Sequence, residues 1–385
     1  MNNQPFPSRR LRIAVLNRHF GYRYGGAERY AAAVVEELAA RHEVHVFAQE
    51  IEHTFPGVNY HHISCPLPKP RWINQLWFAL QTWLRTRQGF DIVHSHENTW
   101  HGDVQTVHVR PFRVGLFHGR SGSRRTLKWL SLITSPRLLA YWWLEAARLH
   151  PHPGKHTIAT SEQVKQETCD AYPGTAAHMH VITPGVNLPQ SPADQAHERA
   201  QLALPPQVPL ALFVGNDYAK KGLGTLLDAL REVPELHLAV VGHGQQIQAF
   251  RQQAQQLQVA DRVHFLGSLP DVTPAYGAAD FLIHPTTEDT YAMVVLEAMA
   301  HGLPVIVSAA PYCGIATELT HGKQALLLTE PRDSRQLAKH LSDLLASTPL
   351  QQRLRAAGQQ FASERSWRAV AQAHERLFLQ MLEST

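Results

Sequence analysis

Two carboxylates beside the expected start of a helix are the groups in this sequence best suited to chemistry. Residues 284–306 have the sequence HPTTEDTYAMVVLEAMAHGLPVI. We expect a strand to end at His284, Asp289 to lie in the polar loop, and Glu297 to lie in the next helix. The amides at 291–293 should be unpaired at the helix N-terminus, where they and the helix dipole attract phosphate. Because carboxylates repel a bare phosphate, the arrangement suits a phosphate flanked by sugar hydroxyl groups.

A pair of lysines follows another expected strand. Residues 210–230 have the sequence LALFVGNDYAKKGLGTLLDAL, in which Lys220 and Lys221 precede Gly222 and a helix. A lysine there can pair with a diphosphate and offset the charge that develops as a sugar–oxygen bond breaks. Without a partner motif, a lysine pair in a loop would be explained by solvation alone.

Two glycine motifs could bring backbone close to a ligand. Gly25 and Gly26 follow the first expected strand and open a helix whose amides can face a phosphate. The second motif, 242–244, has Ile247 where a dinucleotide fingerprint has its third glycine, and no acidic ribose partner is evident. We therefore expect no dinucleotide site.

Four histidines, His94, His96, His101 and His108, suggest a metal site at first sight. No carboxylate or cysteine set completes a ligand group, and no Asp-x-Asp pattern is present. We expect these side chains to be structural or to face a substrate, and we expect no metal.

Strands that alternate with helices must position these groups. This alternation predicts parallel sheets with helices on both faces, and ligands at the carboxyl ends of the strands. A segment rich in Pro, Gln and Ala, 184–209, is the expected link between two doubly wound α/β domains, and the cleft between them is the expected active site. We expect strands at 11–17, 43–48, 91–94, 104–109, 157–160, 180–182, 210–214, 237–241, 263–265, 281–284 and 304–308, and helices at 27–40, 224–231, 245–257 and 293–301.

At these motifs the sequence resembles the retaining glycosyltransferase family 4, which has the GT-B fold. The spacing of Asp289 and Glu297 is similar to the family's E-x7-E signature, with aspartate in place of the first glutamate. The resemblance implies that Glu297 binds the ribose of a nucleotide and that Asp289 contacts the donor sugar. Lys221 matches the family's lysine, whereas Asn216 stands where an arginine is usual. In this and in residues 312–316 (YCGIA) the chain looks most like the lipopolysaccharide core glucosyltransferases.

The resemblance also implies roles for residues of the first half. His108 matches a histidine of the cleft that contacts the donor sugar, and the loop at Gly25 and Gly26 is expected against the donor diphosphate. The catalytic assignments are therefore Asp289, His108 and Lys221. The assignments to donor binding are Gly25, Gly26, Gly215, Asn216, Lys220, Leu266, Tyr291, Ala292, Met293 and Glu297, and those to the acceptor side are Asp103 and Arg29.

Length and composition agree with two soluble domains. The chain has 385 residues, of which 44% are hydrophobic and 18% are charged, so a disordered chain is excluded. It shows no apolar stretch of transmembrane length and no signal peptide at its start. Three cysteines far apart favour a reducing, cytoplasmic setting.

Charge is distributed unevenly between the two halves. Residues 1–185 contain 21 Lys and Arg against 13 Asp and Glu, a net charge of +8, whereas the remainder carries −4. Residues 104–144 contain no acidic side chain, and aromatic, basic segments occur at 71–87 and 141–143. Interfacial helices have this composition, although a core helix with a basic rim would look the same. We expect the first domain to meet an anionic membrane surface; no motif accompanies the basic residues that would indicate nucleic acid.

We therefore expect a retaining glycosyltransferase with domains at 1–185 and 186–365 and a final helix, 366–385, that crosses back to the first domain. It would transfer a sugar from a nucleotide diphosphate sugar, UDP-sugar being the first choice, to a glycan or glycolipid at the inner face of the plasma membrane. No cofactor is expected. Two alternatives remain: a nucleotide-sugar epimerase on the same fold, and a non-catalytic binding subunit.

Overall fold

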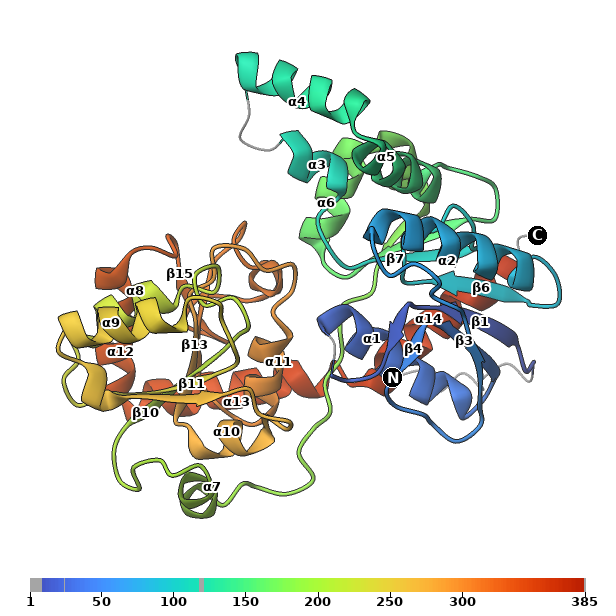
Figure 1. Ribbon diagram of the computed structural model, residues 1–385. Helices are drawn as coiled ribbons and strands as arrows, with labels where there is room; N and C mark the ends of the chain where they lie inside the picture. The colour runs from blue at the N-terminus through green and yellow to red at the C-terminus, as the bar shows by residue number, and fades with distance from the viewer. Residues whose placement is uncertain (1–8, 24, 118–120, 384–385) are drawn as a thin grey trace. The chain divides into compact units, whose positions relative to one another are not determined.

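The computed structural model describes residues 9–23, 25–117 and 121–383, and the chain forms two compact units (Figure 1). Unit 1 contains the described residues up to Thr183 and those from Trp367 onward, and unit 2 contains Pro184–Ser366. Tyr24 and Arg120, which belong to the glycine motif and the basic stretch, lie outside the described residues. The chain therefore enters unit 2 once and returns to unit 1 for its last helix.

Unit 1 is built on a seven-stranded sheet in the order β5-β3-β1-β6-β7-β8-β9. Every neighbouring pair is parallel. The central strands are apolar and buried, as is usual where helices cover both faces of a parallel sheet. The strands are β1 (Arg12–Leu16), β3 (Glu43–Ala48), β5 (Val58–His62), β6 (Ile92–Ser95), β7 (Val104–Val107), β8 (His156–Ala159) and β9 (Met179–Val181), with β2 (His19–Phe20) and β4 (Glu50–Ile51) forming a separate ribbon.

The helices of unit 1 connect these strands, and one of them comes from the far end of the chain. They are α1 (Gly26–Ala39), α2 (Arg71–Thr86), α3 (Phe112–Phe117), α4 (Gly122–Thr134), α5 (Pro136–Leu149), α6 (Glu162–Ala171) and α14 (Trp367–Glu383), with a 3-10 turn η1 at Pro173–His178.

Helix α14 contacts α1 and the segment that follows it through polar side chains. His42 Nε2 lies 3.0 Å from Glu375 Oε1, and Arg41 pairs with the same carboxylate at 2.8 Å. The hydroxyl of Tyr30 lies 3.3 Å from His374 Nε2. These contacts, between residues more than 300 positions apart, make α14 part of the unit 1 core.

Unit 2 contains a six-stranded sheet in the order β12-β11-β10-β13-β14-β15, also parallel throughout. Alternate residues of β10 enter different cores: Leu210, Leu212 and Val214 face one cluster, whereas Ala211 and Phe213 face the other. The strands are β10 (Leu210–Val214), β11 (His237–Val241), β12 (Val263–Gly267), β13 (Phe281–His284), β14 (Val305–Ser308) and β15 (Leu326–Leu328). The helices are α7 (Gln195–Gln201), α8 (Leu223–Leu230), α9 (Ile247–Gln256), α10 (Thr273–Ala278), α11 (Met293–Ala300), α12 (Ser334–Ala346) and α13 (Thr348–Ser363), with 3-10 turns η2 (Ala260–Arg262) and η3 (Gly314–Glu318).

The expected α/β class is confirmed, since both units are doubly wound. The strands expected at 43–48, 210–214, 237–241 and 281–284 have those bounds, and most other expected elements are displaced by one or two residues. The segment 184–209, expected as the link, begins at the boundary between the units but belongs to unit 2 and contains α7. Buried Arg199 ties this helix to unit 2 through Asp280 at 3.0 Å and the carbonyl of Ala278 at 2.8 Å.

Within the described ranges, the structure has no helix that is both long and apolar enough to cross a membrane.

Candidate functional site

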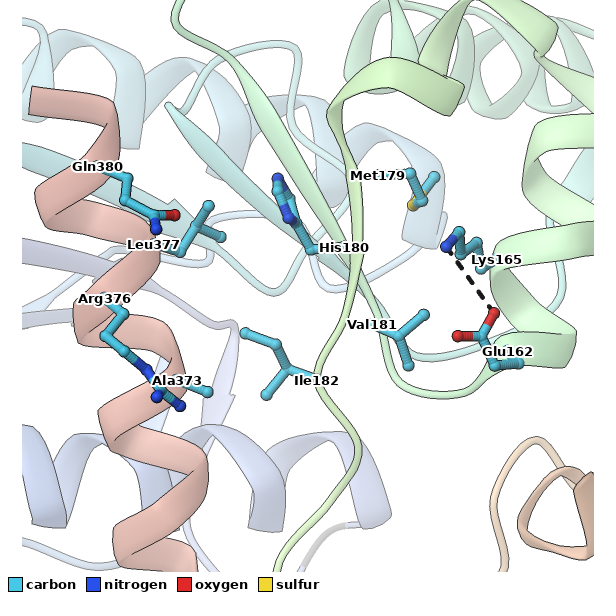
Figure 2. Close-up of a pocket in the computed structure, with 10 residues that line it drawn as sticks. All are labelled: Glu162, Lys165, Met179, His180, Val181, Ile182, Ala373, Arg376, Leu377 and Gln380. Atoms are coloured by element: carbon cyan, nitrogen blue, oxygen red, sulfur yellow. Dashed lines mark ion pairs between the residues drawn. The ribbon is translucent and has the colours of Figure 1, made fainter. Parts of the chain in front are cut away.

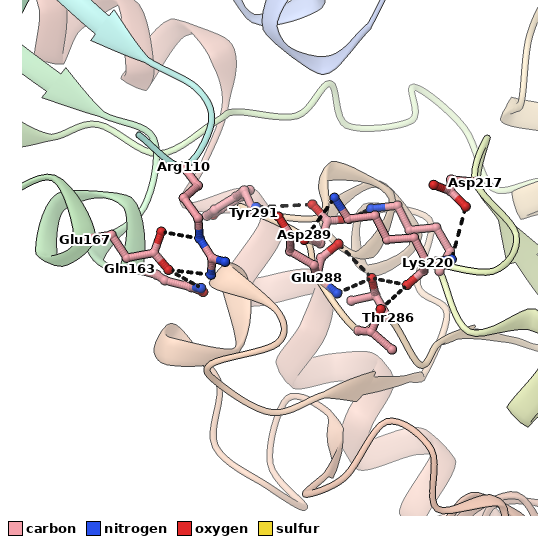
Figure 3. Close-up of polar contacts among 11 residues, drawn as sticks. Arg110, Gln163, Glu167, Asp217, Lys220, Thr286, Glu288, Asp289 and Tyr291 are labelled. Atoms are coloured by element: carbon pink, nitrogen blue, oxygen red, sulfur yellow. Dashed lines mark hydrogen bonds and ion pairs between the residues drawn. The ribbon is translucent and has the colours of Figure 1, made fainter. Parts of the chain in front are cut away.

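Two loops of unit 2 meet at the carboxyl edge of its sheet. Because β10 and β13 are adjacent and parallel, the loop after Val214 lies beside the loop after His284. Gly222 makes this approach possible: its φ is +82°, and a Cβ there would lie 2.0 Å from the carbonyl oxygen of Pro285. The carbonyl of Lys220 accepts hydrogen bonds from the amide and the hydroxyl of Thr287, each at 2.9 Å. It also accepts one from the hydroxyl of Thr286 at 3.2 Å (Figure 3).

The carboxylate of Asp289 is the centre of this junction. Lys221 Nζ donates to Oδ2 at 2.5 Å, and His284 Nε2 lies 3.1 Å from the same oxygen. The other oxygen, Oδ1, accepts from the amides of Ala292 at 2.9 Å and Tyr291 at 3.3 Å. One carboxylate thus joins the lysine loop, the end of β13 and the start of α11.

Burial opposes ionisation of Asp289, but the hydrogen bond from His284 and the charge of Lys221 outweigh it and hold the pKa of Asp289 well below its usual value. Burial lowers the pKa of His284, although the neighbouring carboxylate works in the opposite direction. His284 is therefore neutral near pH 7. Since a carboxylate can only accept, the proton of that imidazole lies on Nε2.

A third loop closes the junction from the other side. The amide of Asp289 donates to the carbonyl of Tyr312 at 2.8 Å, and the amide of Gly314 donates back to the carbonyl of Asp289 at 2.9 Å. The amide of Ile315 donates to the carbonyl of Tyr291 at 3.2 Å. The 312–316 motif found in the sequence therefore fixes the backbone of the Asp289 loop.

The two neighbouring lysines have different surroundings. Lys220 pairs with Glu288 at 3.2 Å, and both side chains are more than two-fifths exposed. Lys221 and Asp289 are 21% and 15% exposed. Solvent screens the first pair, whereas the second is an ordered part of the junction.

Glu297 lies on α11, where Tyr276 of α10 orients it. The Tyr276 hydroxyl donates to Glu297 Oε2 at 2.7 Å. The ring of Tyr276 stacks on that of His301, with centroids 5.2 Å apart. Tyr276 was not found from the sequence, since nothing near it in the chain indicates a contact 21 residues away.

The expectation of unpaired amides at 291–293 is wrong for two of the three. Tyr291 and Ala292 donate to Asp289, because the short aspartate side chain folds back over its own loop as a cap. Ala292 has a left-handed backbone with φ of +66°, and Met293 begins the helix. Their assignment to donor binding remains a prediction.

The remaining donor-side residues lie around the end of β10. Asn216 is exposed beside Gly215, and Gly242 approaches so closely that a Cβ there would lie 2.0 Å from the carbonyl oxygen of Gly215. Leu266, near the end of β12, is half-buried and packs against the core. The structure thus brings Gly215 and Asn216 to the same sheet edge as Lys221, since β10 and β13 are neighbours.

In unit 1, His108 follows the end of β7 and lies in a cluster of aromatic rings. His108 Nε2 is 2.9 Å from His96 Nδ1, and the two rings stack with centroids 5.2 Å apart. Tyr30 meets His108 edge-on at 5.2 Å. Burial lowers the pKa of His108 to about 3, with the nearby Arg148 charge acting in the same direction. His108 is therefore a neutral imidazole, suited to hydrogen bonding.

Asp103 is not brought together with His108. It precedes β7, so the length of that strand separates the two residues. Its carboxylate accepts from the amide of Val93 at 2.7 Å, and its own amide donates to the Val93 carbonyl at 2.8 Å. These bonds tie β6 to β7 at their amino ends, which is a structural role and does not support placing Asp103 on the acceptor side.

The glycine motif forms the start of α1, as expected. Gly25 precedes the helix, Gly26 is its first residue, and Arg29 donates its amide to the carbonyl of Gly25 at 3.0 Å. Gly25 and Gly26 follow β1, which is central in the sheet next to β6. They therefore lie at the carboxyl edge, the same edge of unit 1 as His108.

Helix α4 exposes a large apolar surface. Leu127, Leu130 and Ile133, spaced by three residues, are each more than half exposed, and Trp129 is 44% exposed. Arg124 and Arg125 on the same helix are also exposed. By contrast, Arg110 of the basic stretch is bound by the carboxylate of Glu167 through two bonds of 2.9 and 2.8 Å (Figure 3).

Among the residues that the structure describes, no group of three or more His, Cys, Asp or Glu side chains is arranged to hold a metal ion. A groove of ≈ 600 Å³ lies elsewhere in unit 1, between α6, β9 and α14 (Figure 2). None of the predicted site residues lines it. Its lining residues are Glu162, Lys165, Met179, His180, Val181, Ile182, Ala373, Arg376, Leu377 and Gln380.

Two family models match the chain, one in each half. Residues 24–190 match the model described as Glycosyltransferase Family 4, and residues 194–361 match the model described as Glycosyl transferases group 1. Together the two matches extend over most of the sequence.

Curated relatives include lipopolysaccharide glycosyltransferases and D-inositol 3-phosphate glycosyltransferases. The lipopolysaccharide glucosyltransferase WaaG of Escherichia coli (strain K12) is 32% identical over 166 residues, which are 42% of this chain and 44% of that protein. The chain thus spans less than half the length of this relative. A D-inositol 3-phosphate glycosyltransferase of Frankia alni is 28% identical over 90% of this chain and 92% of its own length.

Solved structures share the whole fold. The crystal structure of WaaG has a TM-score of 0.79 at 21% identity and covers 95% of this chain and 99% of its own. Anabaena HepE, solved with UDP and glucose, has a TM-score of 0.73 at 18% identity over 95% and 99% of the two chains. At these identities the likeness concerns the fold alone.

Proposed function

The chain belongs to the glycosyltransferases of the group 1 and family 4 type, which have the GT-B fold, and we propose that it is a retaining enzyme. It transfers a sugar from a nucleoside diphosphate sugar to a glycan or glycolipid. The observation that carries this proposal is the junction of Lys221, Asp289 and the start of α11 at the carboxyl edge of the unit 2 sheet.

Each group at the junction has a role in this reaction. Lys221 and the positive end of α11 offset the charge on the departing diphosphate. Glu297, oriented by Tyr276, accepts hydrogen bonds from the ribose. Asp289 positions the donor sugar, and the role of His108 in contacting that sugar remains a prediction. In this proposal no metal or other cofactor is needed, because the protein itself supplies the positive charge.

UDP is the proposed nucleotide, and a lipopolysaccharide-type or similar cell-surface glycan is the proposed acceptor. HepE, a protein of the same fold, was solved with UDP and glucose. The names of the relatives leave two acceptor classes, a lipopolysaccharide and an inositol phosphate. The exposed apolar side chains of α4 favour the first, because a small water-soluble acceptor would not require a membrane-binding helix.

Helix α4 is the proposed membrane contact. Its apolar side chains would enter the headgroup region while Arg124 and Arg125 meet anionic lipid. The enzyme would then act as a peripheral protein at the inner face of the plasma membrane, where a glycolipid acceptor is found.

The proposal can be tested by measuring thermal stability with UDP, GDP, ADP and CMP in parallel. A ligand at about 100 times its Kd stabilises the folded state by about 2.7 kcal/mol, which raises Tm by a few degrees. We expect one nucleoside diphosphate to stand out with the wild type and its effect to disappear in Glu297→Gln.

Product analysis with the corresponding sugar nucleotide completes the test. Transfer to acceptor or hydrolysis of donor supports a glycosyltransferase. Conversion of the donor sugar without any acceptor would indicate an epimerase, and wild-type activity in Glu297→Gln would refute the site assignment.

A further inference from the structure

The Asp289 carboxylate occupies the groups that the proposed function assigns to the donor diphosphate. Its two oxygens accept hydrogen bonds from Lys221 Nζ and from the amides of Tyr291 and Ala292. A phosphate oxygen and a carboxylate oxygen accept from the same kinds of donor. A diphosphate that binds there must therefore compete with the protein's own carboxylate.

Among the hydrogen-bond donors to this carboxylate, His284 is the one that an incoming diphosphate cannot easily reach. It ends β13, its side chain is 1% exposed, and its Nε2 lies 3.1 Å from Asp289 Oδ2. Its other ring nitrogen, Nδ1, is buried and has no hydrogen-bond partner. The imidazole is thus committed to a single polar contact, with Asp289.

The chemistry of His284 suits such a contact. A neutral N–H donor can hold a carboxylate in place without adding a positive charge that would itself attract phosphate. Lys221, by contrast, carries a full charge, and its side chain is 21% exposed, so it can turn from a carboxylate to an incoming diphosphate.

We propose that His284 is a positioning residue of the donor site: it retains the Asp289 carboxylate when the donor diphosphate takes over the other donors of that group. This inference rests on the proposed function. Once displaced from its cap and held by His284, Asp289 can accept hydrogen bonds from hydroxyl groups of the donor sugar. Binding of the diphosphate and orientation of the sugar are then coupled through one carboxylate.

The first test is the Kd of the nucleoside diphosphate that stabilises the wild type most, measured by calorimetry on four proteins. Asp289→Ala removes the competing anion, so we expect it to bind the diphosphate about fivefold to tenfold more tightly than the wild type. Glu288→Ala is the matched control, since this neighbouring carboxylate pairs with Lys220 and makes no contact with Lys221 in the structure. We expect its Kd to change by less than about twofold. The fourth protein is His284→Phe.

The second test separates positioning from binding. We expect His284→Phe to keep the Kd for the diphosphate and the KM for the donor within about twofold of the wild type, while kcat for transfer falls on the order of a hundredfold. His284→Gln retains a donor that can reach Asp289, so it should recover most of kcat. A residue that only supports the fold would not give this split between KM and kcat, nor rescue by glutamine.

The outcomes also separate this inference from the proposed function. If no nucleoside diphosphate binds to any of the proteins, the proposed function fails and the inference with it. If the wild type binds one but Asp289→Ala binds it more weakly, the inference alone is wrong. A His284→Gln variant that does not recover kcat would also overturn the inference. The Asp289→Ala measurement stands even if a His284 variant does not fold.

Discussion

The loss of one methylene group has large effects in this site. A glutamate at position 289 could extend from the loop, whereas the shorter aspartate turns back and caps the amides of Tyr291 and Ala292. The same side chain binds Lys221 from a loop 68 residues away. A residue assigned to the substrate is therefore also a structural junction, and variants at 289 will change binding and stability together.

Lys220 and Lys221 provide a matched pair of variants. Lys221→Met removes the cation of a largely buried pair, so we expect the free energy of unfolding to fall by about 1–3 kcal/mol. Transfer should fall by about 10²–10³-fold, as for loss of one electrostatic stabiliser of a leaving group. Urea unfolding and initial rates with saturating donor measure the two effects.

Lys220→Met is the control, because its partner Glu288 is 44% exposed and the pair is screened by solvent. We expect a loss of about 0.2–1 kcal/mol of stability and a change in rate of only a few-fold. Equal effects of the two variants would show that the ordered pair with Asp289 has no special function.

Among the elements, the aromatic, basic segments that the sequence suggested for a membrane surface, 71–87 and 141–143, form α2 and part of α5, and α4 lies within the acid-free stretch 104–144. Helices α2 and α4 both have aromatic and basic residues, but they differ in how much of their apolar side chains the fold leaves exposed. On α2 the indole of Trp77 donates to the carbonyl of Ser64 at 3.0 Å, and Leu80, Trp83 and Leu84 are 38%, 37% and 45% exposed. On α4 the row of Leu127, Leu130 and Ile133 faces solvent. Of these two helices, α4 therefore exposes a larger fraction of its apolar side chains beside basic ones.

Binding to lipid vesicles tests this difference. We expect the wild type to sediment with vesicles that contain anionic lipid, less so as salt rises, because the Debye length shrinks from about 10 Å at 0.1 M to about 3 Å at 1 M. Replacing Leu127, Leu130 and Ile133 with serine should abolish most of the binding. Trp83→Ser on α2 is the control and should bind like the wild type. Binding that neither salt nor the α4 variant weakens would exclude this helix as the membrane contact.

Buried histidines occur throughout the molecule. The chain has 25 histidines, and several form pairs across neighbouring strands: His45 with His61, His156 with His180, and His237 with His264. An N···N hydrogen bond requires one imidazole of each pair to be neutral. Burial lowers the pKa of His61, His156, His180, His237 and His264, and it lowers the pKa of His374 to about 4.

This arrangement predicts that acid destabilises the protein. A histidine whose pKa is lower in the folded state takes up its proton more readily when unfolded, so its contribution to stability is present above about pH 6.5. It is lost as the pH falls from there towards the folded value. We expect Tm to be nearly constant between pH 7 and 8 and to fall steadily from pH 6.5 to pH 5.

Thermal melts across this range measure the effect. His374→Phe removes one buried imidazole and should reduce the slope of Tm against pH. His197→Phe, at an exposed position, is the control and should leave the slope of Tm against pH unchanged. A Tm that does not fall between pH 6.5 and 5 would contradict the prediction.

The sequence by itself determined local features of the structure, namely individual strands and the motifs beside them. Short apolar runs bounded by glycine and polar residues predicted β3, β10, β11 and β13 with their bounds, because a strand buried on both faces must be apolar along its length. The D-x7-E spacing and Lys221 could be recognised for the same reason, since each lies next to the strand or helix that positions it.

Only the tertiary structure decided which groups meet. The tertiary structure brings Lys221 to Asp289 and Tyr276 to Glu297. The contacts by which α14 packs in unit 1, and the helix within the expected link, were decided in the same way, although the sequence predicted that the last helix crosses back. Such contacts join residues far apart in the chain, and their energy depends on burial and on the neighbouring strand, neither of which a local pattern of residue types contains.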